Sequence, residues 1–322
     1  MKHVLFDCDP GIDDALALAL LTGRDDVELL AVTSVAGNVP LEVTTTNALR
    51  LLDFYGRGDI PVIAGAAQPL ARPNVFASHV HGDDGLGGAP LPHPDTPVAP
   101  GSGADALIEH LAARPGEITL LATGPLTNVA LALRREPRIA TWAKEVVLMG
   151  GAWTRGNITP AAEFNFYADP EAAAVVLEAE WRPVLTTLDL TLQVRIEEAR
   201  KNRWRTLGRL SHELLGPAVA GYFDGRSASG TVTAPASHVS AGTGPAIHDA
   251  VAAAYVVAPE LFASLEAMTR VETQGEFTAG MSVIDFGAAR HNSAVLTGLD
   301  LGGFWQLLEG SFATLARRMQ QR

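Results

Sequence analysis

The stretch that decides the fold lies at the start of the chain and reads Val4-Leu5-Phe6-Asp7-Cys8-Asp9-Pro10-Gly11-Ile12-Asp13-Asp14. Its apolar beginning predicts a buried strand, and residues 13–21 that follow predict a helix. Gly11 lets the backbone turn tightly between the two elements. Ligands of open parallel sheets bind beyond the carboxyl ends of strands, and the carboxylates of this stretch fall at such an end. We therefore expect an α/β fold with a functional site at that edge.

The four carboxylates of this stretch need a compensating charge, because they repel one another and because burial raises the cost of that repulsion. A hard divalent cation removes the cost, and clustered carboxylate oxygens suit calcium or magnesium. A solvated turn with an N-capping Asp would explain only one or two of the four. An EF-hand does not fit, since Ile12 stands where its loop needs glycine and Leu18 where it needs the last carboxylate. The sequence predicts a different kind of metal site.

A strand that ends in Asp-x-Asp is also typical of haloacid-dehalogenase-type phosphatases, in which Asp7 would be the nucleophile. That interpretation requires a later lysine to bind phosphate. The chain offers only Lys2, Lys144 and Lys201. The phosphatase is therefore the weaker hypothesis for this stretch, and a metal site of another kind is the stronger one.

Strand-like and helix-like segments alternate through the first two thirds of the chain. Strands are expected at residues 3–6, 27–35, 61–64, 118–122, 145–149, 184–187, 281–286 and 294–297, and helices at 13–21, 41–55, 104–113, 125–134 and from Asp169 and Leu301 onward. This alternation predicts a mostly parallel sheet, mixed at its edge and flanked by helices. We expect one domain over residues 1–322, with a helical portion at about 195–260 over the active-site edge.

Composition excludes several classes of function. The chain of 322 residues is 47% hydrophobic and carries a formal net charge of −12, so binding to nucleic acid or to a membrane surface is not expected. Its one cysteine, Cys8, allows no intrachain disulfide. The first residues do not read as a signal peptide and no apolar run reaches transmembrane length. We expect a cytoplasmic protein.

The opening stretch resembles the signature of the inosine–uridine-preferring nucleoside hydrolase family, which is a strand followed by Asp-x-Asp-Pro-Gly-x-Asp-Asp-Ala. Further segments resemble that family in the same order along the chain. They are Ala36-Gly37-Asn38, His81-Gly82-Asp83-Asp84-Gly85-Leu86-Gly87-Gly88, Ala122-Thr123-Gly124-Pro125-Leu126-Thr127-Asn128, Val147-Leu148-Met149-Gly150-Gly151, Glu163-Phe164-Asn165 and Ile247-His248-Asp249-Ala250. The resemblance implies a nucleoside-hydrolase-like fold and the hydrolysis of ribonucleosides to free base and ribose in nucleoside salvage.

The resemblance also implies a calcium ion and the residues that hold it. Its ligands would be Asp9, Asp14, the Thr123 carbonyl and Asp249, with water and the vicinal ribose hydroxyls in the remaining positions. Calcium takes six to eight oxygen ligands, which suits this set. A water whose pKa is lowered by the metal would lose its proton to Asp9 and attack C1′ of the ribose.

The expected substrate contacts follow from the same resemblance. Asp13 and Asn38 would contact the ribose or the water, Asn157, Glu163 and Asn165 would hold the 3′- and 5′-hydroxyl side, and Met149 would pack beneath the sugar. Anionic groups near the ring would stabilise an oxocarbenium-like transition state.

The leaving base needs a proton or a hydrogen bond. His248 is the first candidate donor and His81 the second, with His79 a weaker neighbour. Tyr222 and Phe223 could stack on the base. The segment Gly225 to Gly244 is expected to border the base pocket, and the sequence does not reveal which base is preferred.

The residues leave open whether the chain is an enzyme or a binding module, and how many copies assemble. A non-catalytic calcium- or nucleoside-binding module would keep Asp9, Asp14 and Asp249 but would lack the leaving-group residues, so His81 and His248 argue against it. The family resemblance implies a homodimer or homotetramer. Apart from other copies of the chain, the expected partner is a small-molecule ribonucleoside substrate.

Overall fold

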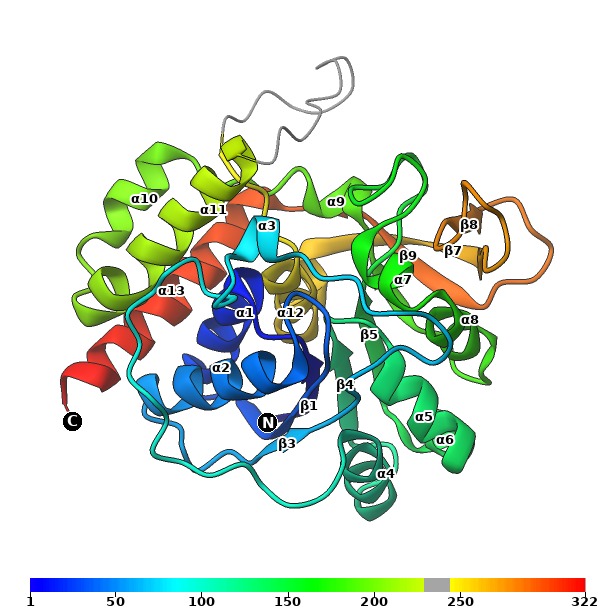
Figure 1. Cartoon of the computed structure of the whole chain (residues 1–322), viewed down its shortest axis with the longest axis horizontal. Helices are drawn as coiled ribbons and strands as arrows, with labels where there is room; N and C mark the ends of the chain where they lie inside the picture. Colours follow the sequence, from blue (N-terminus) through cyan, green and yellow to red (C-terminus); the bar gives the residue numbers. More distant parts are fainter. Residues whose placement is uncertain (229–243, 322) are drawn as a thin grey trace.

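The computed structural model describes residues 1–228 and 244–321, in which nine strands form one sheet (Figure 1). The order across the sheet is β3-β2-β1-β4-β5-β6-β9-β7-β8. The strands are β1 Lys2–Cys8, β2 Val27–Ser34, β3 Val62–Ala64, β4 Ile118–Ala122, β5 Glu145–Met149, β6 Val184–Thr186, β7 Phe262–Val271, β8 Ser282–Asp285 and β9 Ser293–Leu299.

All neighbouring strands from β3 to β9 in this order pair in parallel, and β7 pairs antiparallel with both β9 and β8. The expected mostly parallel sheet with a mixed edge is therefore confirmed. β7 itself was not expected from the sequence. Much of its first half is exposed to solvent, so its residues lack the apolar run that marks the buried parallel strands.

Alternate residues of the central strands enter two separate hydrophobic cores. In β1, Val4 and Phe6 belong to one core and Leu5 to the other. Helices α1 Ile12–Thr22, α2 Leu41–Phe54, α12 Asp249–Val257 and α13 Leu301–Gln320 contribute to the first core, and helices α4 Gly103–Ala113, α5 Thr127–Arg135 and α8 Pro170–Glu178 to the second. Helices thus cover both faces of the sheet, as its buried strands require.

The helical portion expected at about 195–260 is built from separate helices. They are α10 Glu198–Trp204, the π-helix η1 Leu210–Leu215, α11 Gly216–Ala228 and α12. η1 runs directly into α11, which packs against the short helix α3 Ser78–His81. Of the segment Gly225 to Gly244, residues 229–243 lie outside the described part of the chain, so the expectation about the base pocket stays a prediction.

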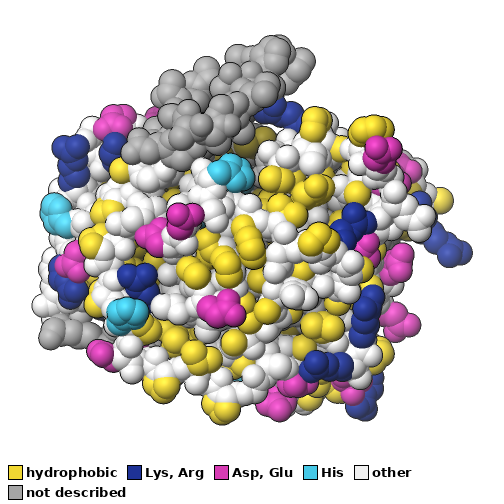
Figure 2. Space-filling model, in the orientation of Figure 1, with side chains coloured by type: hydrophobic (Ala, Val, Ile, Leu, Met, Phe, Trp, Pro, Cys, Tyr) yellow, Lys and Arg dark blue, Asp and Glu magenta, His cyan; other side chains and the backbone are white. Residues whose placement is uncertain are grey.

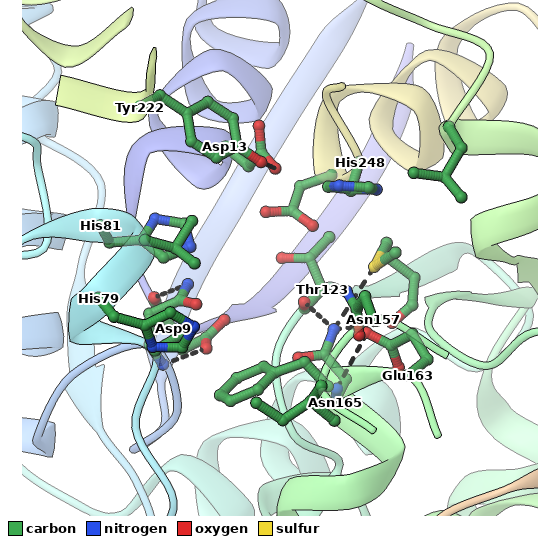
Figure 3. A pocket seen from close by; sticks show the side chains of 18 residues that line it. Asp9, Asp13, His79, His81, Thr123, Asn157, Glu163, Asn165, Tyr222 and His248 are labelled. Carbon is green, nitrogen blue, oxygen red and sulfur yellow. Dashed lines mark hydrogen bonds between the residues drawn. The ribbon is translucent and has the colours of Figure 1, made fainter. Parts of the chain in front are cut away.

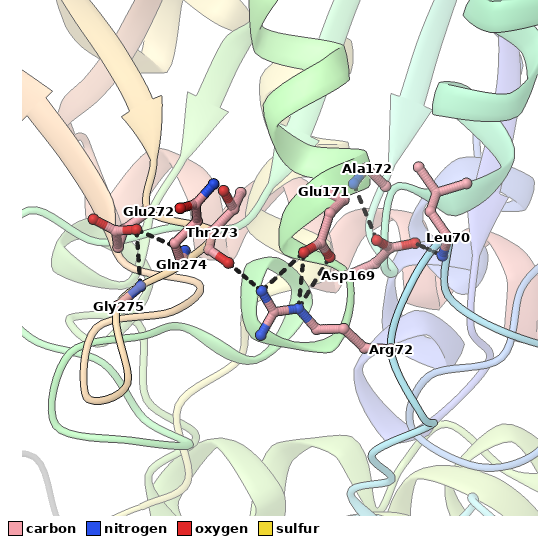
Figure 4. Close-up of polar contacts among 9 residues, drawn as sticks. All are labelled: Leu70, Arg72, Asp169, Glu171, Ala172, Glu272, Thr273, Gln274 and Gly275. Carbon is pink, nitrogen blue, oxygen red and sulfur yellow. Dashed lines mark hydrogen bonds and ion pairs between the residues drawn. The ribbon is translucent and has the colours of Figure 1, made fainter.

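The long connection between β3 and α4 is held at its start by two carboxylates (Figure 4). Arg72 forms a bidentate ion pair with Glu171, at N···O distances of 2.8–3.0 Å, and also donates to the carbonyl of Thr273. The backbone amide of Leu70 donates to Asp169 at 2.9 Å. The connection is therefore fastened to the N-terminus of α8 and to the β7–β8 loop before it reaches α3.

The surface is less acidic than the net charge suggests. Seven acidic side chains in the described residues are buried, namely Asp7, Asp9, Asp13, Asp14, Glu163, Asp169 and Asp249. On the face shown in Figure 2, acidic and basic side chains lie close to one another among hydrophobic and neutral ones. The excess of acids is thus concentrated inside the molecule. None of the described helices is long and apolar enough to cross a bilayer.

Candidate active site

A pocket opens where the parallel strands end. Its lining contains eleven of the twelve residues that the sequence predicts for the site, which are Asp9, Asp13, Asn38, His81, Thr123, Met149, Asn157, Glu163, Asn165, His248 and Asp249. The twelfth, Asp14, is fully buried behind this wall. Figure 3 shows Asp13, His81 and Tyr222 across the pocket from Asn157, Glu163 and Asn165.

The carboxylate of Asp9 lies in a cradle formed by two glycines. An added Cβ on Gly37 would lie 2.1 Å from Oδ2 of Asp9, and one on Gly124 would lie 2.8 Å from Oδ1. The Asn38 amide donates to Oδ2 at 2.7 Å, and the Asn38 side chain donates to the Asp9 carbonyl at 3.0 Å. Asp9 and Asn38 are therefore held as one rigid unit at the end of β1.

Asp14, Thr123 and Asp249 converge beneath Asp9. Asp14 accepts a hydrogen bond from the Thr123 hydroxyl at 2.9 Å and another from the Gly11 amide at 2.9 Å. A hydrogen bond with Asp249 is among the interactions that act on its pKa. Three segments that are distant in sequence thus meet at one cluster of oxygens.

Burial raises the pKa of Asp9, Asp14 and Asp249, and repulsion between these carboxylates adds to the shift for Asp9 and Asp249. A bound dication would relieve both causes, because it would compensate the buried negative charge. Among residues 1–228 and 244–321, no three His, Cys, Asp or Glu side chains already converge as metal ligands. The carbonyl of Thr123, whose hydroxyl binds Asp14, is a further oxygen in this part of the pocket.

The opposite wall is built on the N-terminus of helix α7 Phe164–Ala168. Glu163 caps this helix, accepting from the amides of Asn165 and Phe166, and also accepts from the Gly151 amide at 3.0 Å. Burial raises the pKa of Glu163 to about 7. The Asn165 side chain donates to the carbonyls of Thr123 and Met149. This wall is therefore tied to the ends of β4 and β5.

His81 is a neutral ring with a defined tautomer. Its Nδ1 lies 3.1 Å from the Ile12 amide nitrogen, which can only donate, so Nδ1 is the acceptor and Nε2 carries the proton. Burial, with a smaller contribution from His79, lowers the pKa of His81 to about 4. The ring stacks on Tyr222, whose hydroxyl donates to Asp13 at 3.2 Å. At neutral pH, His81 can donate a hydrogen bond through Nε2 but is not an imidazolium.

His248 precedes α12 and approaches the pocket from the side away from His81 (Figure 3). Its Nδ1 lies 2.7 Å from the hydroxyl of Thr191, in helix α9 Leu188–Thr191. This contact orients the ring, while Asp249 next to it joins the carboxylate cluster. Asn157 lies on the exposed loop before α7.

Several pocket residues were not expected from the sequence. Ala77, Val80, Ile158, Phe164 and Leu192 supply apolar lining. No polar motif marks them, since isolated apolar residues in a sequence are typical of ordinary packing. Tyr222, which was expected only as a stacking residue, also bonds to Asp13. The side chain of Phe223 lies outside the described structure.

Asp7 does not line the pocket, which argues against its role as a nucleophile. It is fully buried, and its Oδ1 accepts from the Thr33 hydroxyl and, at 2.7 Å, from the Asn128 side chain. Asn128 also donates to the Ser34 carbonyl. Asp7 therefore links neighbouring strand ends and has no path to a phosphate ester.

The chain is similar to known nucleoside hydrolases. The family model described as inosine-uridine preferring nucleoside hydrolase matches residues 4–306. The chain is 38% identical over 310 residues to a pyrimidine-specific ribonucleoside hydrolase, RihA, of Salmonella paratyphi B, covering 95% of this chain and 96% of the relative.

Solved structures show the same likeness. A purine-preferring ribonucleoside hydrolase from Gardnerella vaginalis superposes with a TM-score of 0.90 at 27% identity, covering 98% of this chain and all of that one. An inosine-guanosine nucleoside hydrolase gives a TM-score of 0.82 at 29% identity, covering 97% and 99% of the two chains.

Proposed function

Since the chain belongs to the inosine-uridine preferring nucleoside hydrolase family and is a ribonucleoside hydrolase, we propose that it is calcium-dependent and that Asp9 is its general base. The observation that carries this proposal is the glycine cradle, which holds Asp9 rigidly beside two further buried carboxylates. The reaction would release free base and ribose.

Asp9, Asp14, Asp249 and the Thr123 carbonyl are the proposed calcium ligands. The donor set fits, because it consists of hard oxygens and because burial and mutual repulsion leave its carboxylates in need of positive charge. When bound, the ion would supply a Lewis acid that lowers the pKa of water. We propose calcium over magnesium because calcium accepts six to eight oxygen ligands in flexible geometry.

Asp9 would take the proton of the water that attacks C1′. The Asn38 amide already binds Oδ2 of Asp9, so Oδ1 is the oxygen we assign to the proton. The Asn38 side chain, on the pocket wall beside Asp9, would orient the water. Because both residues are fixed before substrate arrives, little reorganisation is needed at the moment of reaction.

The ribose would lie between Asp13 on one side and Asn157, Glu163 and Asn165 on the other, with Met149 beneath the ring. These residues face one another across the pocket (Figure 3). Ionised carboxylates next to the sugar would stabilise the positive charge that develops as the glycosidic bond breaks. This arrangement would therefore stabilise an oxocarbenium-like transition state more than the neutral substrate.

The leaving base would be bound between the rings of His81 and Tyr222 and the ring of His248, which approaches from the other side of the pocket. His248 is the proposed proton donor, with Thr191 orienting its ring. His81 would assist as a neutral hydrogen-bond donor through Nε2, in agreement with its lowered pKa. Tyr222 would close this side as an aromatic wall.

We further propose that pyrimidine ribonucleosides are preferred. The supporting observation is the 38% identity with a relative named as pyrimidine-specific, compared with 27% and 29% for structures named as purine-preferring or as acting on inosine and guanosine. Homodimeric or homotetrameric assembly and a cytoplasmic location also remain proposals.

One experiment tests these proposals together. Purified protein, treated with EDTA and then supplied with calcium or magnesium, is incubated with uridine, cytidine, inosine and a sugar phosphate. We expect ribose release from uridine and cytidine that disappears with EDTA and returns best with calcium. Full activity after EDTA treatment would contradict the metal proposal, binding of uridine without turnover would favour a binding module, and release of phosphate alone would favour a phosphatase.

A further inference from the structure

Two glycines meet where α11 crosses the loop that follows α3. An added Cβ on Gly221 would lie 2.6 Å from the carbonyl oxygen of Gly87 and 2.7 Å from its Cα. Both are backbone atoms, so no side-chain rotation could relieve the overlap. On the other side, a Cβ on Gly87 would lie 3.0 Å from the carbonyl oxygen of Ala218, and Gly87 has a φ of 63°, which disfavours any side chain. Helix and loop therefore touch backbone to backbone.

This contact is connected to the pocket by a closed chain of interactions. The Gly87 amide donates to the His81 carbonyl at 2.9 Å. The His81 ring stacks on the ring of Tyr222, with centroids 5.9 Å apart and an interplanar angle of 26°. Tyr222 directly follows Gly221 in α11. A change in the separation of the two glycines would thus change the offset between the two rings.

The stacked rings are also fixed from the other side, at the start of α1. Nδ1 of His81 accepts from the Ile12 amide, and the Tyr222 hydroxyl donates to Asp13. Each ring therefore has a polar anchor on α1, while the distance between their backbones depends on the glycine contact. Figure 3 shows both rings beside Asp13 at the same side of the pocket.

We propose that Gly87 and Gly221 are positioning residues that set how deeply the Tyr222–His81 wall enters the pocket, and thereby determine how strongly the enzyme discriminates between leaving groups. This inference rests on the proposed function, because it takes the wall to be the base side. Neither glycine touches substrate. A methyl group at position 221 would push α11 away from the loop, displace both rings, and weaken contacts to the base while the carboxylate cluster stays in place.

The test compares Gly221→Ala with wild type on uridine and on p-nitrophenyl riboside, whose leaving group needs no protonation. We expect the ratio of kcat/KM for uridine to that for p-nitrophenyl riboside to fall by about tenfold, because a displacement near 1 Å can cost up to about 100-fold in rate. A smaller folded fraction would lower both rates equally and leave the ratio unchanged. Assays at low temperature retain this ratio even if the variant is unstable.

Gly310→Ala is the matched control. Gly310 also lies within a helix, α13, but a Cβ there meets no atom within 4 Å. Alanine favours helix over glycine, so this variant should keep the wild-type ratio and melt about 2 °C higher. Gly87→Ala adds a methyl group on the loop side of the same contact, and it should lower the ratio as Gly221→Ala does.

The outcomes separate the two proposals. Wild-type enzyme that cleaves neither riboside would overturn the proposed function and this inference with it. Wild-type enzyme that cleaves both, with a ratio unchanged in Gly221→Ala and in Gly87→Ala, would overturn the positioning role alone. A ratio that falls equally in Gly310→Ala would also overturn it, because the effect would not depend on the glycine contact.

Discussion

The side-chain amide of Asn165 donates hydrogen bonds to the carbonyl of Thr123 at 2.6 Å and to the carbonyl of Met149 at 3.0 Å. One buried amide therefore fixes the ends of β4 and β5, and one of these two carbonyls is a proposed calcium ligand. The wall that carries Glu163 and Asn165, here called the sugar wall, is thus linked to the proposed cation site.

Replacing Asn165 by Ala should weaken both stability and calcium binding. Two buried carbonyl oxygens would lose their donor, at a cost of about 1–3 kcal/mol. The melting temperature and a calcium titration measure the two effects. Asn157→Ala is the control, since Asn157 lies on an exposed loop and should change KM for uridine without changing calcium affinity. Equal calcium affinities in wild type and Asn165→Ala would disprove the link.

Asp9→Asn should fold but lose nearly all activity. Asparagine retains an oxygen that can accept from the Asn38 amide, yet it cannot take a proton from water. General-base catalysis contributes about 10²–10⁴-fold, so kcat should fall at least that far. The variant's melting temperature should stay near that of wild type. Wild-type kcat in this variant would remove Asp9 from the role of base.

His248→Ala should slow uridine cleavage far more than cleavage of p-nitrophenyl riboside. The reason is that only the natural base needs a proton or hydrogen bond as it leaves. Thr191→Val, which removes the hydroxyl 2.7 Å from Nδ1 of His248, should show the same selectivity with a smaller loss. If His248→Ala slows both substrates by the same factor, His248 is not the proton donor.

The fastening of the long connection can be tested at Asp169 and Arg72. Asp169→Ala removes a buried acceptor of three hydrogen bonds, from Leu70, Thr127 and Ala172, and should cost about 2–4 kcal/mol of stability. Arg72→Ala removes a partly exposed ion pair and should cost about 1 kcal/mol.

Thermal melts in low and high salt distinguish these two contributions. The loss in Arg72→Ala should shrink at high salt, because exposed charges are screened, and the loss in Asp169→Ala should not. Arg138→Ala, at the exposed surface, is the control and should melt like wild type.

Asp7 should make the stability of calcium-free protein depend on pH. Burial raises its pKa to about 7, against an ordinary value of about 3.9. Between these two pH values the folded state binds more protons than the unfolded state. The contribution of Asp7 to the free energy of unfolding is therefore greatest below about pH 4 and decreases as the pH rises to about 7. Melts of EDTA-treated protein between pH 4 and 8 should show a smaller decline in Asp7→Asn than in wild type. An identical decline in both would contradict the shifted pKa.

The parallel core was predictable because its strands are buried on both faces and read as short apolar runs between helices. β7 was not, because its stability comes from pairing with β9 and β8 and not from an apolar pattern of its own. The break between α10 and η1 likewise escaped the sequence, since the helical pattern continues through residues 205–209.

Within the pocket lining, the acidic residues after the first strand were predicted from the sequence pattern itself, whereas Asn157 and Asn165 were predicted only through the family resemblance. Residues that act through geometry were not predicted. Gly221 has an ordinary helical backbone, and its importance depends on a loop more than 130 positions away in the printed sequence. Leu192 and Ile158 line the pocket only because their loops fold over it. Such roles arise from tertiary distances that no local pattern encodes.

The two sides of the pocket are anchored on different parts of the fold. The carboxylate cluster and the sugar wall are tied to the ends of β1, β4 and β5, whereas Tyr222 and His81 have their backbones in α11 and α3 and reach α1 only through their polar anchors. Substitutions that remodel the second part can leave the first undisturbed. New nucleobase preferences can therefore evolve, or be engineered, by exchanging peripheral segments while bond-breaking is inherited intact.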